Sequence, residues 1–264
     1  MELSLSGRQA IVTGASAGIG HACATMLAES GAEVLAVARG RERLEQVVKE
    51  ATSGGLQGSL TPLAADVTSE DDRMRIVEAA QTAGGPDILV NCAGGSRTLA
   101  IDADEGQWRE AMEVNFWSKH RLTHAVLPGM VERGWGRIVN ITGSSEPKPM
   151  PIYTEGVEGT SSLNAAMPAK AALHAWAKGV AREVARHGVT INSVPPGRIM
   201  SEQVERFYPT EEDRRAYAAE RIPMGRFGDP RELAALVVFL CSEQGSYITG
   251  ELVHVDGGMR NYAF

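Results

Sequence analysis

The sequence predicts a single doubly wound α/β domain over residues 1–264, with a parallel seven-stranded sheet and helices on both faces. Short, continuously apolar runs alternate with longer amphipathic stretches along the chain, as expected for strands that are covered on both faces. A glycine-rich turn joins the first run to the first amphipathic stretch, and neither a repeat nor a linker divides the chain. Strand–helix–strand alternation implies right-handed crossovers and therefore a parallel sheet.

The individual elements follow from apolar runs and helix-start signals. Thr68-Ser69 is expected to cap one helix, and Asp229-Pro230 opens another with Asp as N-cap and Pro in the first turn. The helices are expected at Gly18–Ser30, Arg41–Ala51, Ser69–Ala83, from Pro230 onward and around Lys170 up to Arg186. The strands are expected at Ala10–Val12, Val34–Ala38, Leu60–Ala64, Ile88–Val90, Ile138–Ile141, Thr190–Val194 and Leu252–Val255.

One stretch breaks this rhythm. Residues 143–165 contain three prolines and three glycines without a clear period. A long irregular segment in a compact domain usually serves function. We expect an inserted loop there.

Charge and composition limit the partners. The formal net charge is −7 and no lysine- or arginine-rich run occurs, which argues against a nucleic-acid partner. The N-terminus lacks a signal-peptide pattern, and the apolar run Leu233–Cys241 is too short to span a bilayer. The three cysteines are odd in number and widely spaced, as for buried thiols in a reducing compartment. We therefore expect a cytoplasmic protein without a membrane partner.

The turn from Thr13 to Gly20 carries the first functional signal. Its glycines, Gly14, Gly18 and Gly20, lie between the first expected strand and the first expected helix. Glycine is needed where the chain turns tightly and where backbone approaches phosphate. The helix N-terminus adds free N–H groups and the positive end of the helix dipole. The turn is therefore expected to bind the pyrophosphate of a dinucleotide.

The end of the second expected strand favours one form of the cofactor. An acidic residue there would bind the adenosine ribose hydroxyls and repel a 2′-phosphate. The sequence instead has Ala38 followed by Arg39, with Arg41 close behind. Because a guanidinium suits phosphate, we expect NADP(H) in preference to NAD(H).

Six motifs in order resemble the short-chain dehydrogenase/reductase family over nearly the whole chain. The resemblance rests on Thr13-Gly14-x-x-x-Gly18-Ile19-Gly20, Asp66-Val67, Asn91-Cys92-Ala93-Gly94, Asn115, Asn192-x-Val194-x-Pro196-Gly197 with Ser201 beyond it, and Gly250 with Asp256-Gly257-Gly258. It implies a Rossmann-fold, NAD(P)-dependent cytosolic oxidoreductase, commonly a homotetramer or homodimer, that acts on a small-molecule substrate. It also implies cofactor contacts from Gly14, Ser16, Gly18, Ile19, Gly20, Arg39, Asp66, Val67, Asn91, Ala93, Gly94, Lys170, Pro196, Gly197 and Ser201.

The catalytic centre departs from the family pattern. The family uses a tyrosine as proton donor, a lysine four residues later that lowers the tyrosine pKa and binds the ribose, and a serine that polarises the carbonyl. Lys170 matches the lysine, but Ala166 stands where the tyrosine belongs and Gly143 where the serine belongs. The 23 positions from Gly143 to Ala166 exceed the family spacing. The insertion therefore replaces the standard acid.

Three interpretations of the proton donor stay open. In the first, Tyr153 reaches back from the insertion with Ser144 or Ser145 beside it, which resembles dienoyl-CoA and enoyl reductases. In the second, another donor such as Glu155, Glu158, a serine or a water works near Lys170 and Asn115. In the third, the protein binds dinucleotide without efficient chemistry.

The sequence thus favours NADP(H)-dependent hydride transfer to or from a carbonyl, of the 3-oxoacyl type or another ketone, or to a conjugated double bond. Asn115 is expected to organise a water or orient Lys170. Residues 200–221 fall where the family carries a substrate lid. His120 and His124 have a metal-binding spacing, but no third ligand stands nearby, and we expect no metal.

Overall fold

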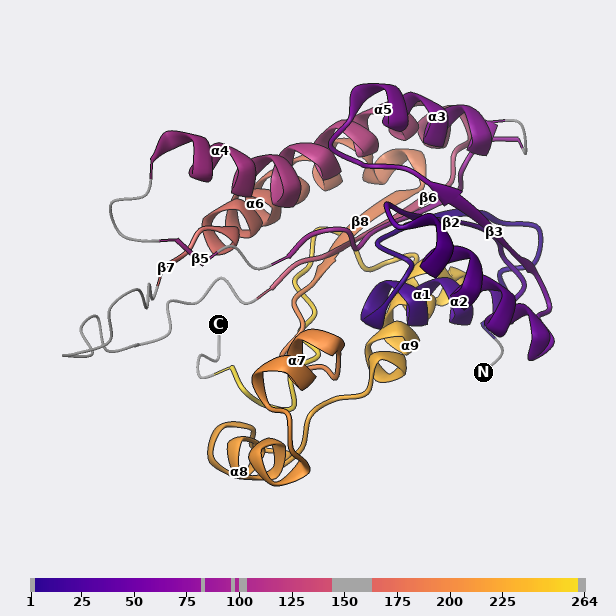
Figure 1. Cartoon of the computed structure of the whole chain (residues 1–264). Coiled ribbons are helices and arrows are strands. Elements are labelled where there is room, and N and C mark those ends of the chain that lie inside the picture. Colours follow the sequence, from indigo (N-terminus) through magenta and orange to yellow (C-terminus); the bar gives the residue numbers. More distant parts are fainter. Residues whose placement is uncertain (1–2, 82–83, 96–97, 100–103, 144–162, 261–264) are drawn as a thin grey trace.

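The computed structural model describes residues 3–81, 84–95, 98–99, 104–143 and 163–260. Its main sheet is parallel and has six strands in the order β3-β2-β1-β4-β6-β8 (Figure 1). The chain turns from the β3 side of β1 to the β4 side, which is the switch point of a doubly wound sheet. The strands are β1 (Gln9–Thr13), β2 (Glu33–Ala38), β3 (Ser59–Ala64), β4 (Ile88–Asn91), β6 (Gly136–Ile141) and β8 (Val189–Val194).

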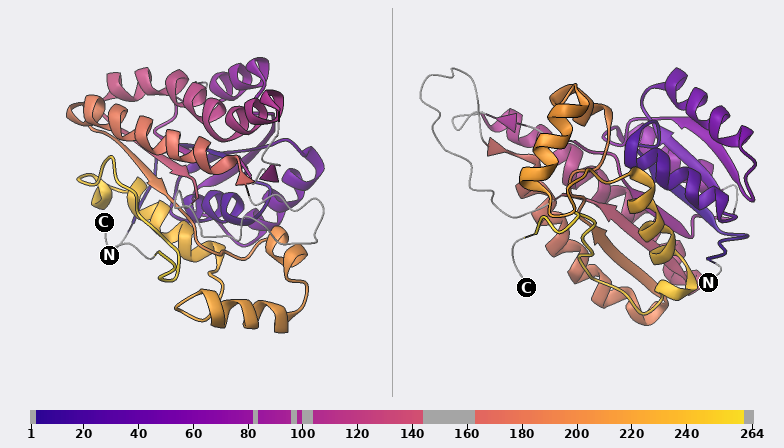
Figure 2. Two further views of the ribbon diagram at one scale, coloured as in Figure 1. Left: turned by 90° about the vertical axis from the view of Figure 1, so that its left-hand side faces the viewer. Right: turned by 90° about the horizontal axis from the view of Figure 1, so that it is seen from below.

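Helices cover both faces of this sheet (Figures 1 and 2). One face carries α1 (Gly18–Glu29), α2 (Arg41–Ser53) and α9 (Pro230–Cys241). The other face carries α3 (Glu70–Gln81), α5 (Ser118–Arg133) and α6 (Ala166–Val184). α4 (Glu105–Met112) runs into a π-helical turn, Glu113–Trp117, before α5, while α7 (Glu202–Phe207) and α8 (Glu211–Arg221) stand apart from both layers. Two 3-10 turns, Ala185–His187 and Glu243–Gly245, follow α6 and α9.

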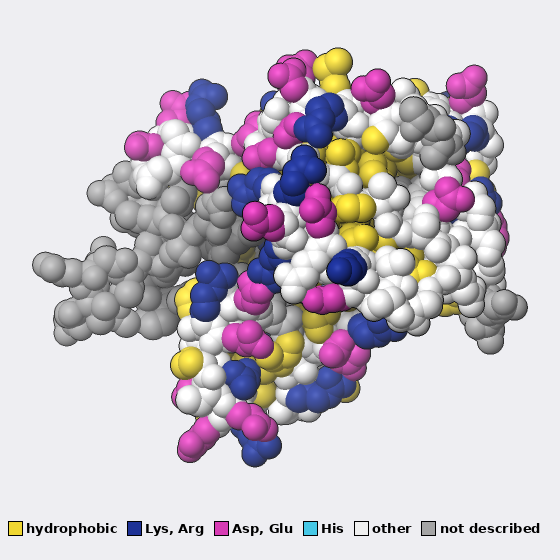
Figure 3. Space-filling view, turned by 45° about the vertical axis from the view of Figure 1, so that its right-hand side comes forward, with side chains coloured by type: hydrophobic (Ala, Val, Ile, Leu, Met, Phe, Trp, Pro, Cys, Tyr) yellow, Lys and Arg dark blue, Asp and Glu magenta, His cyan; other side chains and the backbone are white. Residues whose placement is uncertain are grey.

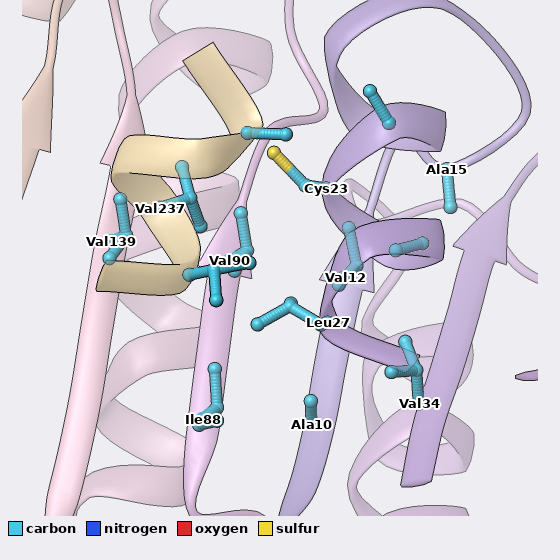
Figure 4. Packing of buried hydrophobic residues seen from close by; sticks show 14 of the residues in the cluster. Ala10, Val12, Ala15, Cys23, Leu27, Val34, Ile88, Val90, Val139 and Val237 are labelled. Carbon is cyan, nitrogen blue, oxygen red and sulfur yellow. The ribbon is translucent and has the colours of Figure 1, made fainter. Parts of the chain in front are cut away.

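The buried core lies on both faces of the strands because successive side chains of a strand point to opposite faces. In β1, Ala10 and Val12 pack with α1 and α9, whereas Ile11 packs with the helices of the other face. Figure 4 shows the first layer, in which Leu27 of α1 and Val237 of α9 lie over the strands. The continuous apolar runs of the sequence are therefore strands buried on both sides.

The prediction of a seventh strand at Leu252–Val255 was wrong. Residues 251–255 run parallel to the end of β8 but form only isolated bridges to it. The Ser193 and Gly197 amides donate to the carbonyls of Glu251 and Val255 at 2.9 Å. The next bond of a regular ladder would need an N–H at position 195, which is proline and has none. The ladder is interrupted there, so the sheet has six strands.

A small second sheet borders the expected insertion. β5 (Thr98–Leu99) pairs antiparallel with β7 (Leu163–Asn164). This pairing places the residues that immediately precede α6 beside the segment that follows β4. Residues 144–162, between β6 and β7, lie outside the described part of the chain.

Surface charge adds little to this framework. Figure 3 shows Lys and Arg interleaved with Asp and Glu over the face that it views. Pairs such as Arg41–Glu45 and Arg231–Glu29 are exposed, and exposed pairs contribute about 0–1 kcal/mol each. Stability therefore comes mainly from the two buried layers. No helix in the described ranges has the length and apolar character needed to cross a membrane.

Candidate active site

A cavity of about 630 Å³ opens at the carboxyl ends of the strands, including the neighbouring strands β1 and β4. Ligands of open α/β sheets bind at this position. With the exception of Asn91, every residue for which we expected a cofactor contact lines the cavity. These residues are Gly14, Ser16, Gly18, Ile19, Gly20, Arg39, Asp66, Val67, Ala93, Gly94, Lys170, Pro196, Gly197 and Ser201.

The glycine turn forms a cradle that a side chain would fill. Gly14 has φ +72° and Gly18 has φ +51°, a region that favours glycine. A Cβ on Gly20 would lie 2.2 Å from the Gly14 carbonyl oxygen. The N-cap of α1, Ala17, makes no side-chain cap and the first turn has no acidic residue. This helix end therefore suits the pyrophosphate of a dinucleotide.

The two arginines after β2 separate in space. Arg39 lines the cavity, while the Arg41 guanidinium lies 3.4 Å from Glu45 within α2. After the neighbouring strand β3, the Asp66 carboxylate accepts hydrogen bonds from the Thr68 amide at 2.9 Å and the Thr68 hydroxyl at 2.8 Å. Of the two arginines, Arg39 is thus the one that brings a positive charge to the cavity.

A third arginine ties the phosphate turn to α7. Arg43 Nε donates to the Ser16 carbonyl at 3.0 Å, and its guanidinium also binds the Glu202 carboxylate. This pair holds the pKa of Glu202 below and that of Arg43 above the ordinary value, through their hydrogen bond. Arg43 was not predicted from the sequence, because α2 carries two arginines, Arg41 and Arg43, and only the fold distinguishes their contacts.

Asn91 and Asn115 lie behind the cavity wall and not on it. Asn91 Nδ2 donates to Thr123 Oγ1 at 3.1 Å and Asn140 Oδ1 at 3.0 Å, so the Asn91 side chain joins β4 to α5 and β6. The fully buried Asn115 donates to the Ala111 carbonyl and accepts from the Gly95 amide at 3.2 Å. It thereby fixes the Gly94 turn at the cavity.

Two lysines reach the cavity from the two helices that flank β6. Lys170 of α6 lies beside Gly143, where a Cβ would be 3.2 Å from its Nζ. Lys119 of α5 is 2% exposed and donates from Nζ to the Ile141 carbonyl at 2.8 Å. Burial lowers the pKa of both lysines, that of Lys119 to about 7 with a further contribution from the Lys170 charge.

Lys119 and the polar side chains around it were not predicted from the sequence. Lys119 follows Asn115 by four residues, which puts both on one helical face, and this spacing could have revealed it. Thr142, Cys92 and Gly143 also line the cavity. Thr142 Oγ1 lies 2.8 Å from His174 Nε2. Burial lowers the pKa of His174 to about 4, so its ring is neutral at pH 7.

The cysteine prediction is correct for two of the three thiols. Cys23 and Cys241 are buried and free. Cys92 is only half-buried at the residue level because it lines the cavity. Desolvation raises the pKa of the Cys92 thiol to about 11, so Cys92 stays protonated at neutral pH.

The proposed displaced donors lie outside the described residues. These are Ser144, Ser145, Tyr153, Glu155 and Glu158. Ala166, by contrast, is described: it is buried and opens α6, one turn before Lys170. The tyrosine position of the resemblance is therefore occupied by a methyl group in the helix that carries the lysine.

The segment at residues 200–221 borders the cavity through α7. Ser201 caps this helix, since its hydroxyl accepts from the Val204 amide at 3.3 Å. Val204, Phe207 and Tyr208 line the cavity, although Phe207 is 69% exposed. The rings of Tyr208, directly after α7, and Tyr217 of α8 are in tilted contact with centroids 4.7 Å apart, which joins the two helices.

The histidine pair forms an aromatic cluster. His120 and His124 have ring centroids 4.4 Å apart, and Trp176 lies 4.9 Å from His120. Within the described ranges, no group of three or more His, Cys, Asp or Glu side chains could hold a metal ion.

The fold and this cavity define a short-chain dehydrogenase/reductase. The family model described as enoyl-(acyl carrier protein) reductase matches residues 14–260, and the chain belongs to this family of short-chain oxidoreductases.

Relatives of known activity match over nearly their full length. The 3-oxoacyl-(acyl-carrier-protein) reductase FabG of Vibrio cholerae is 40% identical over 259 residues, covering 97% of this chain and 99% of the relative. The FabG of Thermotoga maritima is 34% identical with the same coverage. The crystal structure of L-sorbose reductase from Gluconobacter frateurii with NADPH and L-sorbose has a TM-score of 0.87 at 30% identity, covering 99% of this chain and 100% of that one.

Proposed function

We propose that this chain is an NADP(H)-dependent oxidoreductase that transfers hydride to or from the carbonyl of a 3-oxoacyl-type or other ketone substrate, with a non-standard proton donor. The observation that carries the proposal is the meeting of the glycine turn, Arg39 and Lys170 in one cavity. The relatives support both parts, since FabG proteins are named for 3-oxoacyl reduction and a structural neighbour contains NADPH with a ketose.

Different residues of the cavity would bind different parts of the cofactor. The N-terminus of α1 and the glycine cradle would hold the pyrophosphate, and Arg39 the 2′-phosphate. Lys170 would bind the nicotinamide ribose. When bound, NADPH supplies the hydride. Asn115 would act at a distance, because its hydrogen bond to Gly95 positions the Gly94 turn.

Three further features belong to the proposal. Residues 143–165 would cover the substrate position, and residues 200–221 would serve as a lid, held near the phosphate turn by the Arg43–Glu202 pair. The chain would work as a homodimer or homotetramer in the cytoplasm. The whole of residues 1–264 would form one dinucleotide-binding domain.

Turnover of a substrate panel tests the proposal. We expect NADPH oxidation, followed at 340 nm by absorbance, with a 3-oxoacyl thioester or a ketose. Faster turnover of an enoyl thioester, lost in Tyr153→Phe, would instead favour an enoyl reductase with Tyr153 as donor. Tight NADPH binding without turnover of any member would support a binding module and contradict the proposal.

Arg39→Ala should weaken NADPH binding about 10- to 100-fold and leave NADH binding nearly unchanged, because a hydrogen bond to a charged group contributes roughly 1.5–3 kcal/mol. Fluorescence titration with both cofactors measures the effect. Arg41→Ala is the matched control, since Arg41 pairs with Glu45 and does not line the cavity. Equal losses for both cofactors would contradict the role of Arg39.

A further inference from the structure

We propose that Lys119 gives the proton to the substrate oxygen during carbonyl reduction, at the site where a tyrosine at position 166 is missing. The inference rests on the proposed function and names the acid that it requires. The first observation is that Lys119 is only 2% exposed and lines the cavity. Burial of a lysine ammonium is costly unless it is paired or functional.

The backbone places Lys119 at the end of β6, beside Lys170. Its Nζ donates to the carbonyl of Ile141, the last residue of β6, at 2.8 Å. A Cβ on Gly94 would lie 3.6 Å from the same Nζ. Lys170 reaches Gly143, two residues past Ile141, from α6. Two amines from different helices therefore reach the cavity at the end of the same strand.

No carboxylate compensates this pair among the ion pairs of the described residues. Two titratable groups interact with Lys119: Lys170, which lies on α6, and the Cys92 thiol, which follows β4. The Lys119 charge in turn helps to lower the pKa of His174 on α6. Glu113 and Arg121, the charged neighbours on its own segment, pair with each other. Desolvation and the Lys170 charge both favour the neutral amine.

These surroundings make Lys119 an acid that works near neutral pH. Its pKa of about 7 lets the amine hold a proton and recover it from solvent at the same pH. The Thr142 hydroxyl, which also lines the cavity directly after β6, lies 2.8 Å from His174 Nε2. Cys92 has a pKa near 11, too high for efficient proton transfer at neutral pH.

The step balances with groups already named. Hydride adds to the carbonyl carbon, the C=O π pair moves to oxygen, the Nζ–H bond of Lys119 breaks and an O–H bond forms. NADPH, when bound, would supply the hydride and become NADP⁺, the ketone would be reduced to an alcohol, and the neutral Lys119 amine would regain its proton from water.

Lys119→Met tests the role, since it keeps an unbranched side chain, one atom shorter, and removes the amine that carries the proton. We expect kcat for ketone reduction to fall about 10²- to 10⁴-fold, with NADPH affinity and the unfolding transition retained. Lys119→Arg should be equally slow, because a guanidinium stays protonated at neutral pH. Lys49→Met, an exposed position on α2, is the control and should retain full activity.

The pH dependence separates a proton donor from a structural residue. Reduction needs protonated Lys119, so wild-type kcat should fall as the pH rises through about 7, and this bend should vanish in Lys119→Met. Wild-type-like kcat and pH profile in that variant would overturn the inference and leave the proposed function standing. Failure of the wild type to reduce any ketone would overturn the proposed function, and the inference with it.

A second readout does not depend on turnover. NMR of the protein labelled with ¹³Cε-lysine, with Lys119→Met to assign the signal, follows the Lys119 amine directly. We expect it to titrate near neutral pH, well below the ordinary lysine value of about 10.4. A Lys119 signal that titrates above pH 9 would overturn the inference whatever the activity.

Discussion

Gly20→Ala should abolish NADPH binding, with a dissociation constant raised at least about 100-fold, equivalent to ~2.7 kcal/mol. The added Cβ would stand 2.2 Å from the Gly14 carbonyl oxygen and 2.7 Å from its carbon. Both contacts are with backbone, so α1 must move away from the turn that it should present to the pyrophosphate. Overpacking of this kind also costs about 1–3 kcal/mol of stability. Isothermal titration with NADPH and thermal unfolding measure the two effects.

Gly179→Ala is the matched control for this substitution. Gly179 lies inside α6, and a Cβ there would meet nothing within 4 Å. We expect it to stabilise the protein by up to ~1 kcal/mol, because alanine is the better helix former, with NADPH binding unchanged. Wild-type affinity in Gly20→Ala would mean that the turn does not hold the pyrophosphate.

Arg137→Met should lower the free energy of unfolding by about 3 kcal/mol, since removal of one partner from a buried charged network typically costs that much. Arg137 is 2% exposed at the start of β6, and its guanidinium donates to the carbonyls of Gly136 at 2.9 Å and Gly188 at 3.0 Å. It also lies 4.2 Å from the centre of the Trp135 ring, and the Arg8 guanidinium lies 3.6 Å from the same ring. Methionine would leave these carbonyls without their donor.

Chemical denaturation measures the loss, with Arg215→Met as control. Arg215 pairs with Glu211 on the exposed surface of α8, and exposed pairs contribute about 0–1 kcal/mol. Equal stabilities of the two variants would show that the Arg137 contacts do not contribute beyond those of a surface pair. Activity of Arg137→Met below its unfolding temperature should be retained, because the residue is absent from the cavity lining.

Most of the sheet could be predicted because a strand that is buried on both faces has a continuous apolar run in its own sequence. Ile88–Val90 and Ile138–Ile141 are continuous apolar runs, and the structure has strands there because helices cover both faces. The seventh strand was wrong for a local reason. The run Leu252–Val255 has strand composition, but its partner brings Pro195 to the ladder, and a sequence segment does not reveal the partner beside it.

That the glycine turn and Arg39 line one cavity could also be predicted, because each lies directly after a strand of the parallel sheet. The glycine turn and the start of α1 lie within one short segment, and Arg39 follows β2 directly. Asn91 shows the limit of this reasoning. Asn91 ends β4, but its side chain points away from the cavity and donates to Thr123 and Asn140. A buried side-chain amide needs hydrogen-bond partners, and these residues supply them.

What the sequence by itself determined is the family, the doubly wound fold and the glycine turn that lines the cavity, since all three depend on motifs of adjacent residues. It also determined that Ala166 cannot donate a proton. Only the tertiary structure decided that Lys119 joins Lys170 at the end of β6, and that Arg43 rather than Arg41 ties α2 to Ser16. These contacts join residues far apart in the chain, and they exist because parallel strands bring their carboxyl ends to one edge of the sheet.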